Sequence, residues 1–570
     1  MSIIFSFLPL LILLAIVVLV VRKVSNKSKS SNTSAQPVRL FFQYALAFGL
    51  FITVTVGLSG LLGRVIDSSN IVSADQSSLA SNLAFIVVGA PLLAGITLWL
   101  RKSMALNPSD GTGFVPTFFA TLLSIISLLV FLTSAISAMQ ATLDNKPILG
   151  ASFARAIIWG IALVVILRIA NSVIPKNDFR IQYFVGSLIT AIAALVGLIK
   201  VISNLFSAIL SQSNLLGTDQ SAIVTTGNNA LDGFVILVTS GALWFYYWIK
   251  NANTKTNDTM WLSYVLVAGV GGSLVLAVTS VTVTMYQILV WVIGNPASQL
   301  LSEHFASTPA SAASAIVGLL SWWYHKTLLP LNAERSETQR IYEYLVSAIS
   351  LIASTVGLSI VIVAMIEALT KSVIVGDSAL NTLLGAATVI LVSGPVWWRF
   401  WSRIQRLAKS SPEIELSSPI RRIYLFLLFG VGGIVAIVSL ITVVFQIFNG
   451  LLSSSLGSTT INEMRFALGI LISTGIVAAY HWEIYRHEKD VEVSFGTDTK
   501  SILLVGPVDQ EFVSALKHAT GAHVTFWERT DASEIAWPLD RVIELVQQAT
   551  SEQLLVILGT TGVTAIPVTH

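Results

Sequence analysis

Apolar residues along most of this chain are grouped into long uninterrupted runs, separated by short polar segments. The clearest example lies between residues 340 and 487, where a long apolar run, a polar gap and a shorter apolar run occur twice in succession. The first copy ends at Trp397 and Trp398, and the second at Trp482. About 20 apolar residues are enough to cross a bilayer as a helix. The pattern therefore predicts a repeated pair of transmembrane helices, a hairpin.

The same pair of runs can be traced six times, each time as a longer first helix and a shorter second helix. The expected first helices cover roughly 39–66, 114–143, 178–211, 259–294, 339–373 and 420–454. The expected second helices cover roughly 82–100, 153–173, 229–249, 307–325, 380–400 and 464–484. Tryptophans near the ends of the second helices recur about every 70–85 residues, which indicates tandem copies of one unit.

The segments before the hairpins have a different pattern. Residues 3–21 form one more apolar run, and its basic residues, beginning with Arg22 and Lys23, come only after it. A cleaved signal peptide carries its charge before the apolar core, so we expect an uncleaved anchor over residues 1–24 with its N-terminus outside. Residues 25–36 are rich in Ser, Asn and Lys and are expected to form a linker to the hairpin region, 37–490.

The last segment, residues 491–570, predicts a small soluble α/β domain. Short apolar strands are expected at 501–506 and 523–528, followed by a closing hairpin of 554–558 and 563–568. Helices are expected over 509–520, ended by Gly521, and over 540–550. The expected fold is thus an all-α polytopic membrane protein of about 13 spans, followed by a cytoplasmic α/β domain with a mixed sheet.

Composition agrees with a membrane protein and excludes several classes of function. Only 11% of the 570 residues are charged, against about 25% in soluble domains, and the mean hydropathy is +0.78. The net charge of +3 gives no indication of nucleic-acid binding. The absence of cysteine excludes disulfides, thiolate-ligated metals and thiol catalysis.

The distribution of Lys and Arg predicts the orientation in the membrane. The segments after the first run and after each second helix carry 20 of these residues, whereas the opposite loops and nearby helix ends carry five, Arg64, Lys146, Arg155, Lys371 and Arg465. Loops rich in Lys and Arg lie on the cytoplasmic side of bacterial membranes. We therefore expect a multi-pass protein of the bacterial plasma membrane with the α/β domain in the cytoplasm.

Two groups of residues are candidates for defined structural roles within the helices. Glycines that recur in the first helices allow neighbouring helices to approach closely; they are Gly57, Gly60, Gly63, Gly269, Gly272, Gly430 and Gly433. Tryptophans near the second-helix ends are expected to form an interfacial belt; they are Trp99, Trp244, Trp248, Trp322, Trp323, Trp397, Trp398 and Trp482. A gating hinge remains an alternative for the glycines, and stacking of a pigment or quinone for residues 244–248.

Residues that could support chemistry are few and lie near helix ends. The ionisable side chains within the apolar runs, Arg155, Arg168, Lys200, Asp232 and Glu367, are expected at the water boundary, Glu367 paired with Lys371. His325 and His481 follow aromatic clusters and are interpreted as interfacial rather than as metal or chlorin ligands. The tail has no phosphate-binding glycine motif and no nucleophile elbow. We thus expect no catalytic residue, no metal and no cofactor.

The aromatic opening of the first helices and the aromatic close of the second helices carry a resemblance. Arg340-Ile-Tyr342 and Arg422-Ile-Tyr424 begin the fifth and sixth hairpins, and Tyr324-His325 and Tyr480-His481 close the fourth and sixth. In these features the hairpin resembles a domain of unknown function that recurs in tandem in bacterial membrane proteins, notably of the Chloroflexota. The resemblance is expected to cover about 37–490, weakest in the second copy, and implies no functional residue.

These observations favour a non-enzymatic membrane scaffold or accessory subunit of a bacterial membrane assembly. Its expected partners are membrane lipids and other membrane subunits or copies of itself, and not nucleic acid. A channel or transporter for an uncharged or lipidic solute, regulated by the tail, is the second hypothesis. A pigment- or quinone-binding subunit is the third.

Overall fold

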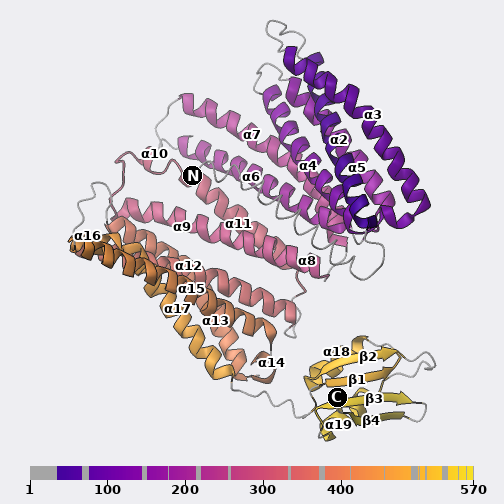
Figure 1. Ribbon diagram of the computed structural model, residues 1–570. Coiled ribbons are helices and arrows are strands. Elements are labelled where there is room, and N and C mark those ends of the chain that lie inside the picture. Colours follow the sequence, from indigo (N-terminus) through magenta and orange to yellow (C-terminus); the bar gives the residue numbers. More distant parts are fainter. Residues whose placement is uncertain are drawn as a thin grey trace. The chain divides into compact units, whose positions relative to one another are not determined.

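The computed structural model is mainly helical and ends in a small sheet (Figure 1). It describes residues 35–66, 76–143, 150–176, 179–212, 220–254, 258–330, 336–370, 379–410, 412–416, 418–454, 456–489, 499, 501–507, 510–528, 537–549, 551–559 and 562–568. The chain divides into two compact units. One comprises residues 1–402 with 436–473, and the other comprises 403–435 with 474–570.

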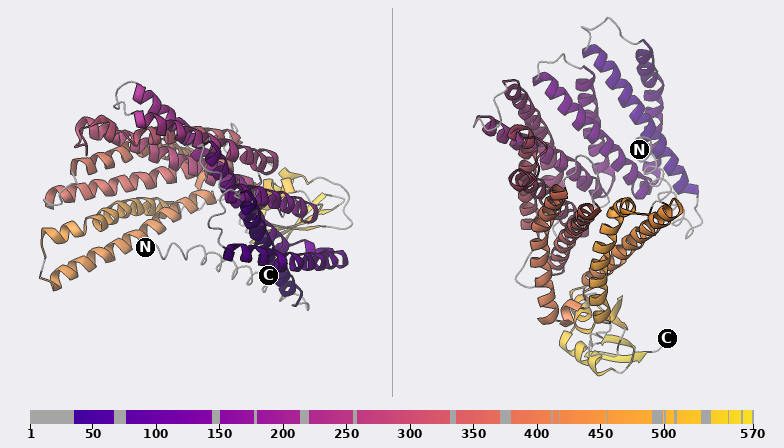
Figure 2. Two further views of the ribbon diagram at one scale, coloured as in Figure 1. Left: turned by 90° about the horizontal axis from the view of Figure 1, so that it is seen from above. Right: turned by 90° about the vertical axis from the view of Figure 1, so that its left-hand side faces the viewer.

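The helices alternate as the apolar pattern predicts. The first helices of the six hairpins are α2 (Ala35–Ile66), α4 (Phe114–Leu143), α6 (Arg180–Gln212), α8 to α9 (Thr259–Ile293, continuous through the π-helical segment η5, Tyr264–Gly271), α12 (Glu337–Thr370) and α15 (Pro419–Leu452). The second helices are α3 (Gln76–Leu106), α5 (Gly150–Val173), α7 (Gln220–Trp244) with η3 (Phe245–Asn251) and η4 (Ala252–Thr254), α11 (Thr308–Leu328), α13 (Ala379–Ser410) and α17 (Arg465–Lys489). Figure 2 shows these helices from two further sides.

The second helices are longer than their apolar runs. Helices α3 and α13 have 31 and 32 residues and are thus as long as most first helices. The additional turns lie at both ends of α3 and at the C-terminal end of α13, and they contain Ser, Gln, Lys and Arg beside apolar residues. A helix satisfies its own backbone hydrogen bonds, so it can continue past the apolar run wherever polar side chains reach water. Hydropathy therefore located these helices but underestimated their length.

Eleven helices among the described residues are long and apolar enough to cross a membrane, which are the properties of a membrane-spanning protein. The expected anchor, residues 3–21, and the linker up to residue 34 lie outside the described residues. The span expected at 307–325 corresponds to helix α11, which is not among these eleven because it is less apolar. Its lower apolar content suits its position between other helices. It packs against α6 and α9, where small and polar residues suit helix contacts: Ser273 donates to Ser321 at 2.7 Å, and Thr284 donates to Ser311 at 2.8 Å.

One packing rule relates the hairpins of the first unit. Each first helix contacts its own second helix and also the second helix of the following hairpin. The second kind of contact joins α2 to α5, α4 to α7 and α6 to α11. It continues where Tyr286 of α9 meets Gly385 of α13 and where Ser359 of α12 meets Gly469 of α17. The unit is therefore a row of hairpins in which second helices lie between successive first helices.

The second unit contains the start of α15, the end of α17 and the C-terminal sheet. Gly432 of α15 faces Ala478 of α17, and Phe429 packs edge-on to Trp482 at 5.1 Å. The sheet has the order β2-β1-β3-β4, formed by β1 (Ser501–Gly506), β2 (His523–Glu528), β3 (Gln553–Gly559) and β4 (Gly562–Val568). β1 is parallel to β2 and β3, and β3 is antiparallel to β4, so the sheet is mixed as expected.

Helices α18 (Gln510–Thr520) and α19 (Leu539–Gln548) contact each other and cover one face of this sheet. The alternating strand residues Ile502, Leu504, Leu554 and Val556 are buried beneath them with Leu516 and Val542. Gly521 follows α18 with φ 68° and closes the helix by donating its N–H to the Lys517 carbonyl. The hydrophobic core of the tail thus lies under its two helices, and burial alternates along β1 and β3.

Candidate functional site at the arginine-rich helix ends

Ion pairs recur where the first helices begin, which we call the arginine-rich end of each hairpin. Arg39, at the start of α2, contacts Asp110 at 3.1 Å in the segment before the next first helix. Asp110 is 1% exposed and also accepts a 2.5 Å bond from Ser103. Arg180, at the start of α6, pairs in the same way with Asp258, which precedes α8. Equivalent positions two hairpins apart therefore hold the same contact.

The fifth and sixth hairpins begin with similar pairs. Buried Arg340 pairs with Glu337 within the first turns of α12. In the second unit Arg421 is 1% exposed and donates to both carboxylate oxygens of Glu488, at 2.5 and 2.8 Å, and to Gln405 at 2.9 Å. A buried charge is tolerated only with such partners. These arginines are therefore structural groups at the starts of the first, third, fifth and sixth hairpins.

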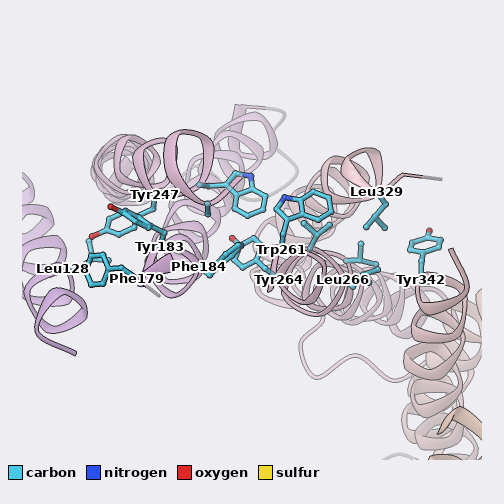
Figure 3. Packing of buried hydrophobic residues seen from close by; sticks show 14 of the residues in the cluster. Leu128, Phe179, Tyr183, Phe184, Tyr247, Trp261, Tyr264, Leu266, Leu329 and Tyr342 are labelled. Carbon is cyan, nitrogen blue, oxygen red and sulfur yellow. The ribbon is translucent and has the colours of Figure 1, made fainter. Parts of the chain in front are cut away.

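An aromatic cluster joins the third and fourth hairpins at the same end. Trp248 of the π-helical segment η3 stacks on Tyr264 of η5, with ring centres 4.5 Å apart. Figure 3 shows Tyr264 next to Phe184 within this cluster. Trp248 is fully buried and donates its indole N–H to the Tyr324 hydroxyl at 2.8 Å. The cluster continues through Tyr247, Tyr183 and Phe179. π-Helical turns are frequent at functional sites, so this cluster is the first place to look for a ligand.

His325 lies inside this cluster, and its surroundings are filled by protein. Its Nδ1 lies 2.8 Å from the Ser321 carbonyl of its own helix, and its ring is 5.0 Å from that of Tyr324. A Cβ on Gly269 would overlap the imidazole. The ring therefore occupies the space that a glycine leaves open, and packing accounts for its burial.

His481 is likewise fully buried, at the end of the sixth hairpin. Its Nδ1 lies 2.8 Å from the Val477 carbonyl, and the ring of Tyr424 packs nearby. Both histidines are buried between helices, and their expected place at the membrane interface stays a prediction.

The glycines named from the sequence lie in two kinds of surroundings. Gly57 and Gly60 face Asn82 of α3, and Gly63 faces the backbone of Ala151 in α5. By contrast, a Cβ added to Gly272 or Gly433 would meet no described atom within 4 Å, and one on Gly430 would meet Phe426 of its own helix. Close packing is thus confined to part of the group.

The closest helix approaches involve glycines that the sequence pattern did not single out. A Cβ on Gly197 would lie 2.5 Å from the Leu237 nitrogen, and one on Gly318 would lie 2.8 Å from the Ala277 nitrogen. Gly233 faces Val201 of α6 in the same way. Gly233 and Gly318 lie on second helices, whereas the conspicuous runs of small residues in the sequence lie on first helices.

Four of the eight tryptophans proposed for an interfacial belt are exposed. Trp99, Trp323, Trp398 and Trp482 are 52%, 62%, 65% and 47% exposed. Trp244, Trp322 and Trp397 are partly buried, and Lys326 lies over the Trp322 ring at 5.1 Å. Trp248 is the exception, since it belongs to the buried cluster described above. The belt itself stays a prediction.

Among the ionisable residues within the helices, Arg155 and Glu367 lie near helix ends. Lys200 and Asp232 lie further inside α6 and α7. Arg155 and Lys200 are exposed, Asp232 is partly buried, and Arg155 donates to the carbonyl of Ala151 in its own helix. Glu367 pairs with Arg465 of α17 at 3.0 Å, both side chains being less than 20% exposed. The expected partner of Glu367, Lys371, lies outside the described residues. No group of three metal-ligating side chains occurs within the described ranges.

Two apolar cavities lie between successive second helices of the first unit. The smaller, about 230 Å³, is lined by α2, α3, α4 and α5, including Phe48, Phe119 and Ile166. The larger, about 1000 Å³, lies along α5 and reaches Phe131 of α4 and Tyr246 of η3. Each has one arginine in its lining, Arg101 in the first and Arg168 in the second. Both arginines lie near the arginine-rich end of a second helix.

In the C-terminal domain, the place where parallel sheets often bind ligands is occupied by a side chain. Ligands commonly bind beyond the carboxyl ends of parallel strands. Here Trp537 packs on Gly506 at the end of β1, stacks on Phe512 at 5.0 Å and donates its indole N–H to the Pro507 carbonyl at 3.0 Å. The indole fills this position in the way that a bound planar group would.

The fold and these sites define a helical membrane-type protein built from tandem hairpins. Comparison with known families agrees: residues 40–169 and 340–476 each match a family described as Domain of unknown function (DUF5671). The two matches are consistent with tandem copies of one uncharacterised domain and confirm the resemblance stated above. No curated protein and no solved structure matches the chain.

The boundaries of the matches correct the expected extent of the repeat. Each matched region holds four long helices, which are α2 to α5 in the first region and α12, α13, α15 and α17 in the second. Each matched region therefore spans two hairpins. The second hairpin, expected to match least, lies inside the first region, whereas the third and fourth hairpins lie between the two regions. The resemblance thus does not extend over 37–490.

Proposed function

We propose that this protein is a non-enzymatic integral membrane scaffold, or accessory subunit, of a bacterial membrane assembly. The observation that carries this proposal is the packing rule of the first unit, in which second helices are shared by two first helices. Such a row resembles a solenoid, whose stability comes from contacts between neighbouring repeats. The helix ends are joined by ion pairs, and the aromatic cluster is packed with protein. These features favour a rigid framework.

The two ends of the row support association with further helices. Helix α15 is the last first helix, and the described chain has no following hairpin to pack on it. It exposes large apolar side chains, including Ile434, Val438, Ile441, Phe445 and Phe448. At the other end, no described first helix precedes α3, which exposes Val87, Val88 and Leu92. We infer that another membrane subunit or a second copy covers these faces.

The orientation proposed for the protein follows from its charges. The arginine-rich ends carry most of the Lys and Arg residues, and cytoplasmic loops are enriched in these. We propose that these ends and the C-terminal domain face the cytoplasm of the cell, and that the glycine- and serine-rich turns face outward.

Chemical cross-linking tests the proposal at its most specific point. The chain has no native cysteine, so Ile441→Cys and Val87→Cys are the only thiols in a double variant. Ile441 lies about as far from the arginine-rich end of its first helix as Ser359 does, and Val87 lies about as far from that end of its second helix as Gly469 does. The two cysteines therefore correspond to the internal contact between Ser359 and Gly469. Oxidation in native membranes should give cross-linked oligomers if copies associate end to end, and the matched pair Leu391→Cys with Val87→Cys should not.

Purification in mild detergent covers the other partners. A heteromeric assembly of constant composition supports the accessory role, and end-to-end oligomers support a scaffold made of copies. A lone monomer, with no cross-link in the membrane, would contradict both.

A lipid or apolar-solute transporter is the second candidate function, and the two apolar cavities are the observation that favours it. Transport requires a continuous path across the membrane, whereas these cavities lie at the arginine-rich end and along one helix pair. Liposomes containing the protein should show exchange of a fluorescent phospholipid between leaflets if this function is correct. An exchange rate equal to that of protein-free liposomes would reject it.

A further inference from the structure

The strongest unassigned feature of the molecule is the pair of arginines in the two apolar cavities. Arg101 lies within the last two turns of α3, which ends at Leu106, and Arg168 lies in the corresponding part of α5, which ends at Val173. They belong to successive second helices and to successive cavities. The packing rule therefore places the same arrangement twice, one hairpin apart.

These arginines differ from those that begin the first, third, fifth and sixth hairpins. Arg39, Arg180, Arg340 and Arg421 each have an acidic partner. Within the described ranges, Arg101 and Arg168 have neither an ion pair nor a side-chain hydrogen bond, and both are exposed. A permanent positive charge beside an apolar surface attracts an anion, and guanidinium groups bind phosphate with two parallel hydrogen bonds.

The larger cavity combines this charge with a long apolar wall. Ile157, Ile161 and Val164 line it along α5 and lead up to Arg168 at one end. Asn171 and Ser172 add polar groups to the lining at that same end. Its volume of about 1000 Å³ is at the upper limit of ordinary ligand pockets, about 300–1000 Å³. A ligand that fits has a negative head and a long apolar tail.

We propose that the two cavities are binding sites for anionic phospholipid, with the phosphate on Arg101 or Arg168 and an acyl chain along the apolar wall. The lipid comes from the leaflet at the arginine-rich ends. Anionic lipids are attracted to basic groups at the membrane surface, and burial of the chain adds specificity that simple snorkelling into headgroups lacks. This inference goes beyond the scaffold role and does not depend on partners.

Native mass spectrometry with phosphatidylglycerol as the probe tests the proposal. The delipidated wild-type protein should bind two molecules saturably, and phosphatidylcholine should bind more weakly. Arg168→Gln should remove one of the two sites, and Arg101→Gln with Arg168→Gln should remove both. Each substitution removes the charged hydrogen bonds between the guanidinium and the lipid phosphate. The loss in affinity at that site is therefore expected to be on the order of tenfold or more.

Matched variants separate a specific site from a general effect of charge or folding. Lys102→Gln removes the neighbouring charge outside the cavity lining, and Arg155→Gln removes a charge from the other end of α5; both should bind like wild type. Arg168→Lys keeps the charge and should retain the site with a smaller loss. Glycerol 3-phosphate in excess should not displace the lipid.

Two results would overturn the proposal. One is equal binding by wild type, Arg168→Gln and Lys102→Gln. The other is displacement by glycerol 3-phosphate alone, which would identify a site for free phosphate esters.

Discussion

At the scale of single residues, glycines determine how closely the helices of this protein pack. Gly197, Gly233 and Gly318 allow helix backbones to come closer than any Cβ would permit. In a bilayer there is no hydrophobic driving force between helices, so van der Waals contact and short polar bonds must hold them together. The absence of a side chain at Gly269 likewise leaves the space that the His325 ring fills.

Two glycines of α7 offer a matched test of this role. Gly233→Ala places a methyl group 2.7 Å from Lys200 Cβ and 3.0 Å from the Val201 nitrogen. We expect a loss of about 1–3 kcal/mol, typical of overpacking. Gly241→Ala on the same helix meets no described atom within 4 Å and should be neutral or slightly stabilising. Thermal unfolding in detergent measures both, and equal melting temperatures would contradict the assigned contact.

The acidic partners of the hairpin-initiating arginines give a second prediction. Asp110→Asn removes the charge of a residue that is 1% exposed and bonded to Arg39 and Ser103. The expected cost is about 1–3 kcal/mol, as for a weakened buried hydrogen bond. Asp258→Asn, at the equivalent pair, should cost less because Asp258 is 40% exposed. The ratio of the two losses in unfolding free energy tests whether burial sets the strength of these pairs.

At the scale of elements, contacts between consecutive hairpins are as specific as those within a hairpin. The pairs Asn295–Asn381 and Glu367–Arg465 join first-helix ends to the next second helices, away from the arginine-rich side. Hydropathy cannot reveal such pairs because they link residues 86 and 98 positions apart. A spacing of four residues along one helix led us to expect Lys371 as the partner of Glu367, whereas the described partner is Arg465 of another helix.

A double-mutant cycle tests the Glu367–Arg465 contact. Glu367→Gln and Arg465→Gln should each destabilise the protein, and their combined loss should be smaller than the sum. The expected coupling is about 0.5–3 kcal/mol, the range for residues in one polar contact. Arg155→Gln combined with Glu367→Gln should be additive, since Arg155 bonds within its own helix in the described structure. Additivity in the first pair as well would show that the two side chains do not interact in the membrane.

Much of the element pattern was predictable because apolar runs mark helices directly. The six first helices and the strands of the tail lie within a few residues of their expected bounds. The full lengths of α3 and α13 were not predictable, since polar residues at the bilayer boundary do not say whether a helix continues. The cavities at Arg101 and Arg168 depend on which helices become neighbours, and only the three-dimensional packing gives this.

At the scale of the whole molecule, the first unit is a row of membrane hairpins whose arginine-rich ends lie on one side. The proposed lipid sites and the proposed scaffold both depend on this arrangement. It also explains α11, which is less apolar than the other helices because it packs among α6, α9 and η5. The excess of Lys and Arg at these ends is the basis for proposing that they face the cytoplasm.

Single-cysteine labelling measures this arrangement most directly, because the chain has no cysteine of its own. Ser109→Cys lies in the turn η2 (Pro108–Gly111) at the arginine-rich end, and Ala297→Cys lies in the segment after α9 at the opposite end. In intact right-side-out vesicles, a membrane-impermeant maleimide should label Ala297→Cys at once and Ser109→Cys only after the vesicles are opened. Labelling of both positions in sealed vesicles, or of Ser109→Cys alone, would contradict the proposed arrangement.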